Sequence, residues 1–304
     1  MIKRWWIAGA LLHAGMAVWS CGTQAQPRPD RPLDRQPSTS AVGVADYRVE
    51  RFVLPSPIRS KGYRIQVWRP LAPPPPEGYP TLYMLDGNAV FESLVQTGRE
   101  QGAPRAVPAL IVGIGYDVDD RFDVDARSYD YTPPSPGDDS PIGMPNNPKA
   151  RGRPGGGADR FLDFIEDQLK PVIAARYPVD ATNQGLYGHS FGGLLVLHAL
   201  FTRPQAFRTY VAASPSIWWN NRFILSEAKT FAERGWNGST RRLLVMAGEK
   251  EVADQIAEAK PGKLVSDLSA TQGVVAEYRE FAGLGHGQML PASVGPGLFF
   301  STAK

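Results

Sequence analysis

The chain has 304 residues, of which 42% are hydrophobic and 21% are charged, as in ordinary globular proteins. Lysine and arginine number 33 against 30 aspartates and glutamates, so the formal charge is only +3. This near-neutral balance argues against a basic nucleic-acid-binding protein. The 31 glycines and 28 prolines cluster in a few segments, which indicates loops and a linker rather than a collagen-like or disordered chain.

Residues 1–25 have the pattern of a secretory signal peptide. Lys3 and Arg4 precede an apolar run from Trp5 to Trp19 that is too short for a membrane span, and cleavage after Ala25 fits the small-x-small rule. Alternatively, the segment ending in Cys21 resembles a bacterial lipoprotein box, in which this cysteine would carry a lipid anchor. Both interpretations predict a periplasmic or secreted protein, and no later segment has the length of a membrane helix.

Residues 26–42 are rich in Pro, Arg, Asp, Gln and Ser, and this composition predicts a disordered tether. Residues 43–304 are predicted to form one α/β domain with a mainly parallel sheet and helices on both faces, because strand and helix patterns alternate. The long polar segment 116–157 is predicted to be a functional or mobile loop. In chain order, strands are expected at 47–54, 63–68, 81–85, 108–114, 186–187, 208–213, 243–247 and 274–281. Helices are expected at 89–96, 161–173, 194–201, 222–234, 252–270 and the C-terminus.

Residues 188–192, Gly-His-Ser-Phe-Gly, fit the pattern G-x-S-x-G. The pattern alone is common, but here a short strand ends at Tyr187 and an apolar helix follows. A sharp strand-to-helix turn of this kind exposes a serine hydroxyl above a sheet, and glycines keep the turn free of clashing side chains. The context therefore predicts Ser190 as a nucleophile, at a helix N-terminus that favours a developing anion. The alternative is a glycine-rich turn with an incidental serine.

A serine nucleophile needs a base, and the chain has four histidines. His13 lies in the signal peptide. His189 flanks the serine and is expected to point away from its hydroxyl, whereas His198 lies two turns along the next helix and is expected to be a packed residue. His286 remains, in a loop just after the last predicted strand, where the order Ser, acid, His places the base.

The acid is expected after the strand 243–247, where Glu249, Glu251 and Asp254 all occur. We favour Glu251, four residues beyond the strand end, because the acid must reach His286; its role is to fix the imidazole tautomer and stabilise the imidazolium. Alternatively, Glu251 is simply an exposed acidic residue at the start of a helix, where acidic residues are favoured. A serine–histidine dyad without an acid is also compatible with the sequence.

An oxyanion hole needs two backbone N–H groups. One is expected from Phe191, the residue after the nucleophile. The other is expected from the turn after the third strand, at Gly87, with Asn88 as the alternative donor.

Four segments together resemble the enterochelin-esterase branch of the α/β-hydrolases, between about residues 79 and 286. The resemblance implies hydrolysis of the esters of an enterobactin-like catecholate siderophore by a secreted serine esterase. Some members are thought to use a serine–histidine dyad. Others are general carboxylesterases, so another acyl substrate is an alternative. A hydrolase fold used only for binding is a further alternative, against which the intact Ser190, His286 and elbow glycines argue. The segments are Leu85-Asp86-Gly87-Asn88, Arg127-Ser128-Tyr129-Asp130-Tyr131-Thr132-Pro133, Gly188-His189-Ser190-Phe191-Gly192-Gly193 and Ser214-Pro215-Ser216-Ile217-Trp218-Trp219.

A ferric tris-catecholate is an aromatic anion, which arginine and aromatic rings would bind. Arg127 is therefore a candidate substrate-binding residue, unless it pairs with Asp130 in its own loop. Trp218 and Trp219 are candidates too, with one of the two expected in the core.

No cofactor or metal site is expected. Five aspartates between residues 117 and 125 form an acidic run, but its spacing matches no calcium loop, so it is interpreted as a solvated loop. No histidine–cysteine cluster or glycine-rich phosphate loop is present.

Overall fold

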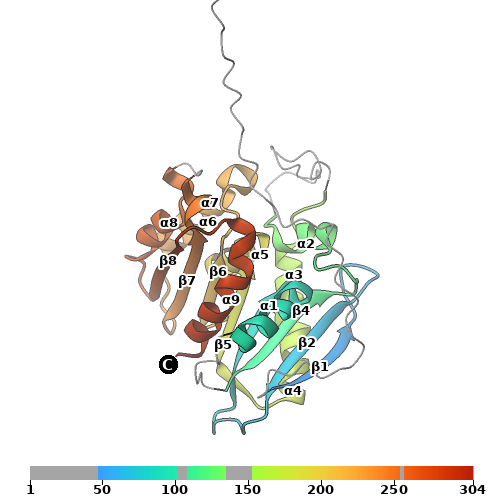
Figure 1. Cartoon of the computed structure of the whole chain (residues 1–304). Coiled ribbons are helices and arrows are strands. Elements are labelled where there is room, and N and C mark those ends of the chain that lie inside the picture. The colour runs from blue at the N-terminus through green and yellow to red at the C-terminus, as the bar shows by residue number, and fades with distance from the viewer. Residues whose placement is uncertain (1–46, 101–107, 135–152, 254–256, 304) are drawn as a thin grey trace, which may run out of the picture.

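Eight strands form one sheet in the computed structural model (Figure 1). The structure describes residues 47–100, 108–134, 153–253 and 257–303. The strand order is β1-β2-β4-β3-β5-β6-β7-β8. The β1/β2 and β2/β4 pairs are antiparallel, and all later pairs are parallel. The predicted fold class is thus confirmed. The strands are β1 (Tyr47–Leu54), β2 (Tyr63–Pro70), β3 (Tyr79–Leu85), β4 (Leu110–Tyr116), β5 (Val179–His189), β6 (Thr209–Ala213), β7 (Arg241–Gly248) and β8 (Val274–Phe281).

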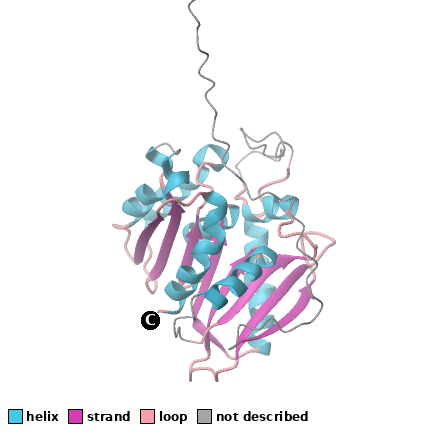
Figure 2. Ribbon diagram, in the orientation of Figure 1, coloured by secondary structure: helices cyan, strands magenta, loops and turns pink. Residues whose placement is uncertain are grey.

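Helices cover both faces of the sheet (Figure 2). One apolar core lies between the sheet and helices α1 (Gly87–Glu100) and α9 (His286–Thr302). The second core lies on the opposite face, under α3 (Ala158–Phe164), a π-helical turn (Ile165–Leu169), α4 (Lys170–Arg176), α5 (Phe191–Thr202), α6 (Trp219–Arg234) and α8 (Pro261–Leu268). The short helices α2 (Val124–Tyr131) and α7 (Glu249–Ala253) and a 3₁₀ turn (Ala257–Ala259) complete the set.

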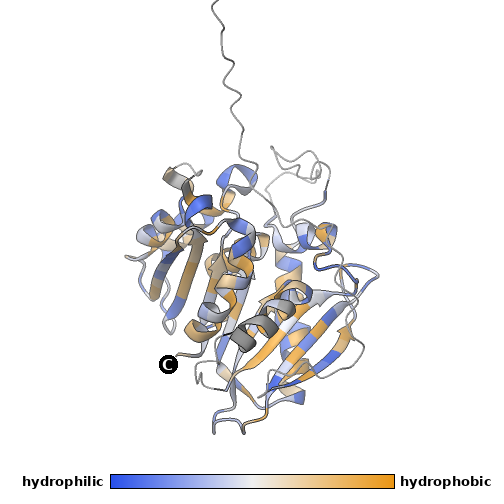
Figure 3. Cartoon of the chain, viewed as in Figure 1, coloured by the Kyte–Doolittle hydropathy of each residue, from blue (hydrophilic) through white to orange (hydrophobic). Residues whose placement is uncertain are grey.

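Hydropathy explains this layering. Every residue of β3, β4 and β6 is buried, as expected for strands covered on both faces. Strand β1, at the edge of the sheet, mixes polar with hydrophobic residues and has no fully buried position (Figure 3). Helix α5 is apolar all round and is buried from Phe191 to Phe201, which is typical of a helix enclosed in a core.

Three elements differ from the sequence-based expectation. Helix α2 lies in the segment predicted as a loop, because its buried side is polar and therefore shows no apolar periodicity. Strand β5 begins at Val179, well before the predicted residues 186–187, since its first half is polar and only partly buried. The predicted helix 252–270 is divided, with Pro261 at the start of α8, where a proline fits a first helical turn but cannot continue a preceding helix.

The predicted signal peptide, the tether at 26–42 and Cys21 lie outside the described residues. Across the described ranges, no helix combines the length and the apolar character needed to cross a bilayer.

Helix α5 is tied to its neighbours by a buried histidine. His198 Nδ1 contacts Glu227 Oε2 of α6 at 2.8 Å, and Nε2 contacts Asp159 Oδ1 of α3 at 3.3 Å. Burial alone would lower the pKa of His198, but these two carboxylates raise it to about 9. The charged imidazolium therefore holds three helices together at neutral pH, and the expectation of a packed histidine agrees with this position.

We predict that His198→Gln removes a pH-dependent part of the stability. A raised pKa means that the contribution of His198 is complete below about pH 6.5 and disappears as the pH rises through about 9. The difference in unfolding free energy between wild type and variant should therefore shrink by about 3 kcal/mol from pH 6 to pH 10. Urea unfolding at several pH values measures it, and a constant difference would contradict the prediction.

Candidate active site

The turn between β5 and α5 has the sharp geometry of a nucleophile elbow. Ser190 has φ 62° and ψ −115°, a conformation that non-glycine residues rarely adopt. Its N–H donates to the Ala213 carbonyl at 2.9 Å, and its own carbonyl accepts from Ser216 N at 3.1 Å and Leu194 N at 3.0 Å. Hydrogen bonds to β6, to the loop after β6 and to α5 therefore hold the strained residue.

The glycines around this turn have different roles. A Cβ at Gly188 would lie 2.3 Å from the Gly192 carbonyl oxygen, and one at Gly193 would lie 2.9 Å from the Ala213 carbonyl oxygen. Both contacts are with backbone atoms, so these two positions require glycine. A Cβ at Gly192 would meet nothing closer than the Leu85 side chain at 3.4 Å, so the clash expected there does not arise.

Three of the predicted site residues form a chain of hydrogen bonds. His286, the first residue of α9, contacts Ser190 Oγ through Nε2 at 2.9 Å and Glu251 Oε2 through Nδ1 at 2.7 Å. Because a carboxylate only accepts, Nδ1 carries the proton and Nε2 is left to accept from the serine hydroxyl. The three side chains come from the ends of β5, β7 and β8, which meet at one edge of the sheet.

Glu251 is fixed by two further donors. Its Oε1 accepts from Gly248 N and from Ser214 Oγ, each at 2.6 Å. Burial alone would raise the pKa of Glu251, but hydrogen bonds from His286, Ser214 and Gly248 lower it below the ordinary value. The carboxylate therefore stays ionised and correctly turned toward the histidine.

The other acid candidates are placed differently. Glu249 Oε2 accepts from Gly283 N at 2.7 Å and so binds the β8–α9 loop rather than the imidazole. Asp254 lies outside the described residues.

His189, which was expected to point away from the Ser190 hydroxyl, lies beside His286. Its ring lies 4.8 Å from the His286 ring, centroid to centroid, and its Nε2 donates to the His286 carbonyl at 2.9 Å. Burial, His286 and Arg127 hold the pKa of His189 well below its ordinary value. A neutral imidazole therefore packs against the start of α9, where His286 lies.

The two expected oxyanion-hole residues both begin helices. Gly87 is the first residue of α1 and Phe191 the first of α5, so neither N–H has an intrahelical acceptor. Asn88 has a different function: its Nδ2 donates to the carbonyls of Tyr116, Val118 and Asp120, and its Oδ1 accepts from Tyr116 N. These bonds fasten the β3–α1 turn to the end of β4.

Arg127 is placed differently from the expectation. Its side chain is only 3% exposed, so it does not stand at the surface to meet an anionic substrate, and it pairs with Asp86 rather than Asp130. Asp130 instead accepts from Arg59, Tyr63 and Tyr116. Burial raises the pKa of Asp130 to about 6, against the lowering effect of these partners. Both residues face inward because α2 packs with its polar side toward the core.

The two tryptophans separate as expected. Trp219 is 2% exposed and belongs to the core, so it is not accessible to a substrate, contrary to its candidacy for substrate binding. Trp218 is only partly buried, and its ring lies 6.1 Å from the Phe191 ring, centroid to centroid. Trp218 is therefore the aromatic side chain that remains available beside the elbow.

Three aspartates of the acidic run at residues 117–125 bind protein groups nearby. Asp117 pairs with Arg64, Asp123 caps α2 through Ala126 N, and Asp125 pairs with Arg153. Among the described residues, no group of three metal-binding side chains is close enough to hold an ion.

Residues 60–288 match the model of the Esterase family, described as "Putative esterase". The chain belongs to this family. It is 39% identical over 251 residues to the ferri-bacillibactin esterase BesA of Bacillus subtilis, covering 80% of this chain and 85% of the relative. It is 31% identical over 288 residues to the apo-salmochelin esterase of Escherichia coli O6:H1, covering 92% and 87%.

Solved structures of similar sequence share this fold. The BES protein from Bacillus cereus superposes with a TM-score of 0.73 at 32% identity, over 84% of this chain and 96% of that one. This chain is a carboxylic ester hydrolase with the fold of the esterase family. The predicted resemblance is therefore confirmed.

Two residues that contact this site, Asp86 and Ser214, have no separate role in the sequence-based interpretation. Both come directly after buried strands, at the edge where the other site residues lie. Their positions directly after buried strands were the sequence signal that could have identified them, since ligands of such sheets bind at the carboxyl ends of the strands.

We predict that Gly188→Ala lowers the unfolding free energy by about 3 kcal/mol, since the added methyl would overlap the Gly192 backbone. Gly192→Ala is the matched control; the new methyl makes an ordinary contact there, and alanine is the better helix former by about 1 kcal/mol. Thermal unfolding of both variants measures the difference. Equal melting temperatures would show that the elbow is looser than described.

Proposed function

We propose that this esterase cleaves the ester bonds of a trilactone catecholate siderophore through an acyl-enzyme on Ser190. The observation that carries the serine mechanism is the hydrogen-bonded chain Ser190–His286–Glu251, with distances of 2.9 Å and 2.7 Å. What supports the substrate class is the likeness to relatives named ferri-bacillibactin and apo-salmochelin esterases.

The chemistry follows from this arrangement. Ser190 Oγ attacks the ester carbonyl carbon while its proton moves to His286 Nε2. Glu251 stabilises the imidazolium through Nδ1–H, and the N–H groups of Gly87 and Phe191 receive the oxyanion. The carbon–oxygen bond breaks as His286 returns the proton to the leaving alcohol. Water, deprotonated by the same nitrogen, then hydrolyses the acyl-enzyme to give the carboxylic acid and free Ser190.

Trp218 is proposed to stack on a catechol ring of the substrate. Its partial exposure beside Phe191 supports this role, since aromatic stacking adds about 0.5–1.5 kcal/mol beyond burial. The proposed role does not extend to Trp219.

We also propose that the protein is exported, because residues 1–25 carry the signal-peptide pattern. Mass measurement of the mature N-terminus separates cleavage after Ala25 from lipid attachment at Cys21, and an uncleaved chain would contradict export.

A product assay tests the substrate. Purified protein is mixed with a tris-catecholate trilactone, with and without Fe³⁺, and products are followed by mass. Linear trimer, dimer and monomer are expected. Comparison of the two conditions shows which form is hydrolysed. Cleavage confined to a simple aryl ester would keep the esterase and discard the siderophore.

Substitutions test the mechanism. Ser190→Ala should lower turnover on the order of a millionfold, because the nucleophile and base act as a unit. Glu251→Gln should lower turnover by about 10⁴-fold, since the amide cannot hold the same imidazole tautomer. Both variants should retain the wild-type circular dichroism spectrum. A Glu251→Gln enzyme with unchanged kcat would instead indicate a serine–histidine dyad.

A further inference from the structure

Arg127 and Asp86 form a buried, bidentate ion pair. Arg127 Nε donates to Asp86 Oδ1 and Nη2 donates to Oδ2, each at 2.9 Å, and the two side chains are 3% and 2% exposed. The pair joins α2 to the turn between β3 and α1. Only arginine presents two parallel donors to a carboxylate in this way.

The Arg127 guanidinium stays charged in spite of its burial. Burial alone would lower the pKa of the Arg127 guanidinium, but the adjacent Asp86 carboxylate raises it above its ordinary value. Buried ion pairs of this kind contribute little net stability, because desolvation offsets much of the attraction, and they can instead define one geometry.

Asp86 is fixed at every polar group. Its φ of 53° is left-handed, an unusual conformation for a non-glycine residue. Its N–H donates to the Tyr131 hydroxyl at 3.1 Å, and its carbonyl accepts from Ala89 N at 2.9 Å and Val90 N at 3.0 Å. Because Asp86 shares a peptide plane with Gly87, the orientation of Asp86 sets the direction of the Gly87 N–H.

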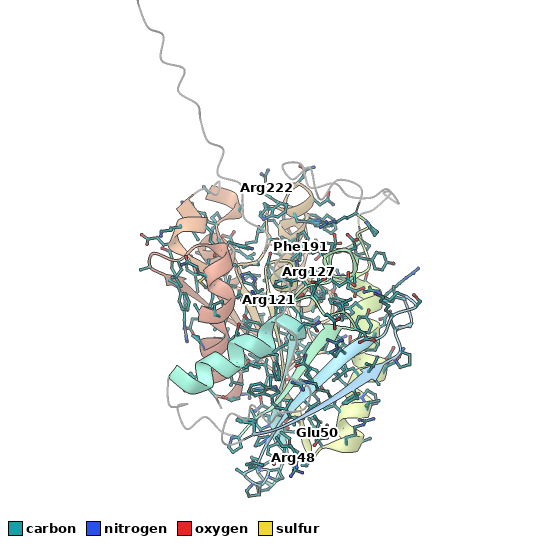
Figure 4. The ribbon with its side chains drawn as sticks, turned by 45° about the vertical axis from the view of Figure 1, so that its right-hand side comes forward. Arg48, Glu50, Arg121, Arg127, Phe191 and Arg222 are labelled. Atoms are coloured by element: carbon teal, nitrogen blue, oxygen red, sulfur yellow. The ribbon has the colours of Figure 1, made fainter. Side chains whose placement is uncertain are left out.

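The same arginine also contacts Phe191, whose N–H is the second expected donor of the oxyanion hole. The Arg127 guanidinium carbon lies 5.5 Å from the centroid of the Phe191 ring, and Figure 4 labels the two residues close together. The Asp86 carboxylate also lies against the start of α5, where a Cβ on Gly192 would be 3.8 Å from Oδ2. The ion pair thus touches the turn that carries Gly87 and the helix start that carries Phe191.

We propose that Arg127 is a positioning residue that sets the two oxyanion-hole N–H groups relative to each other, acting through Asp86 on one side and the Phe191 ring on the other. This inference rests on the proposed serine mechanism. It replaces the expectation that Arg127 contacts an anionic substrate, and it makes a different kinetic prediction for neutral substrates.

The test compares Arg127→Met, Asp86→Asn and the double variant on two substrates, a catecholate trilactone and neutral p-nitrophenyl acetate. Each single variant should lower kcat by about 10²-fold on both substrates, the usual effect of one misplaced oxyanion donor, with KM changed less than threefold. The inhibition constant of an aryl boronic acid, whose tetrahedral Ser190 adduct occupies the same hole, should rise by a similar factor.

Asp130→Asn is the matched control. It weakens the ion pair between Asp130 of α2 and the partly buried Arg59, without touching the β3–α1 turn. It should lower the melting temperature about as much as Asp86→Asn but leave kcat within twofold of wild type. If Arg127→Met fails to fold, Arg127→Lys keeps the charge and loses the bidentate contact, so it takes the same test.

The double variant separates positioning from a purely structural role. It leaves no unpaired buried charge, so its melting temperature should recover relative to the single variants while kcat stays low. Recovery of kcat together with stability would overturn the proposal. So would an Arg127→Met enzyme with normal kcat on the neutral ester and a raised KM on the anionic one. A wild-type enzyme that hydrolyses neither ester and does not bind the boronic acid would refute the serine mechanism itself.

Discussion

The strained backbone at Ser190 is the constraint on which the rest of the site depends. A φ of 62° and ψ of −115° cost a non-glycine residue about 1–3 kcal/mol. The residue keeps this conformation because Ala213, Leu194 and Ser216 all hydrogen-bond its backbone. The hydroxyl is thereby directed at His286, at the N-terminus of a buried helix. Gly188 and Gly193 are the accompanying requirement, because β5, β6 and α5 approach too closely there for any side chain.

A positive φ, as at Ser190, recurs at two neighbouring strand ends. Asp86 follows β3 with φ 53°, and Ser214 follows β6 with φ 44°. Strands β3, β5 and β6 are adjacent in the sheet. Each turn therefore brings a polar side chain to the same edge: Asp86 meets Arg127, Ser190 meets His286, and Ser214 meets Glu251. Three locally strained residues build one polar layer above an apolar sheet.

Charge in this layer is buried only with a partner. Glu251 is bound by His286, Ser214 and Gly248, and Asp86 is bound by Arg127. One neutral imidazole, that of His189, packs directly on His286. Such pairing fixes side-chain direction, because moving either member would leave an uncompensated buried charge. A rigid arrangement of this kind suits ester hydrolysis, in which donors must already face the oxyanion when it forms.

The sequence by itself determined the class of fold and the elements that bear the chemistry. Apolar runs and strand–helix alternation predicted the sheet, and the pattern at residues 188–192 together with the position of His286 picked out the two residues now in contact. These signals are local, since periodicity and turn chemistry are written in consecutive residues. The polar helix α2 was not predictable in this way, because its inward face carries Arg127 and Asp130 rather than apolar residues.

Only the tertiary structure decided which polar residues meet. Glu249 and Glu251 both follow β7 closely, and spacing favoured Glu251 without excluding Glu249. The structure decides between them, because Glu251 contacts His286 whereas Glu249 binds the β8–α9 loop. Arg127 could face solvent, Asp130 or Asp86, and the packing of α2 against the end of β3 selected Asp86. Trp218 and Trp219 separate for the same reason, since the start of α6 buries the Trp219 ring and leaves the Trp218 ring partly exposed. Such pairings depend on distances between segments far apart in the chain, and no local pattern of residues encodes them.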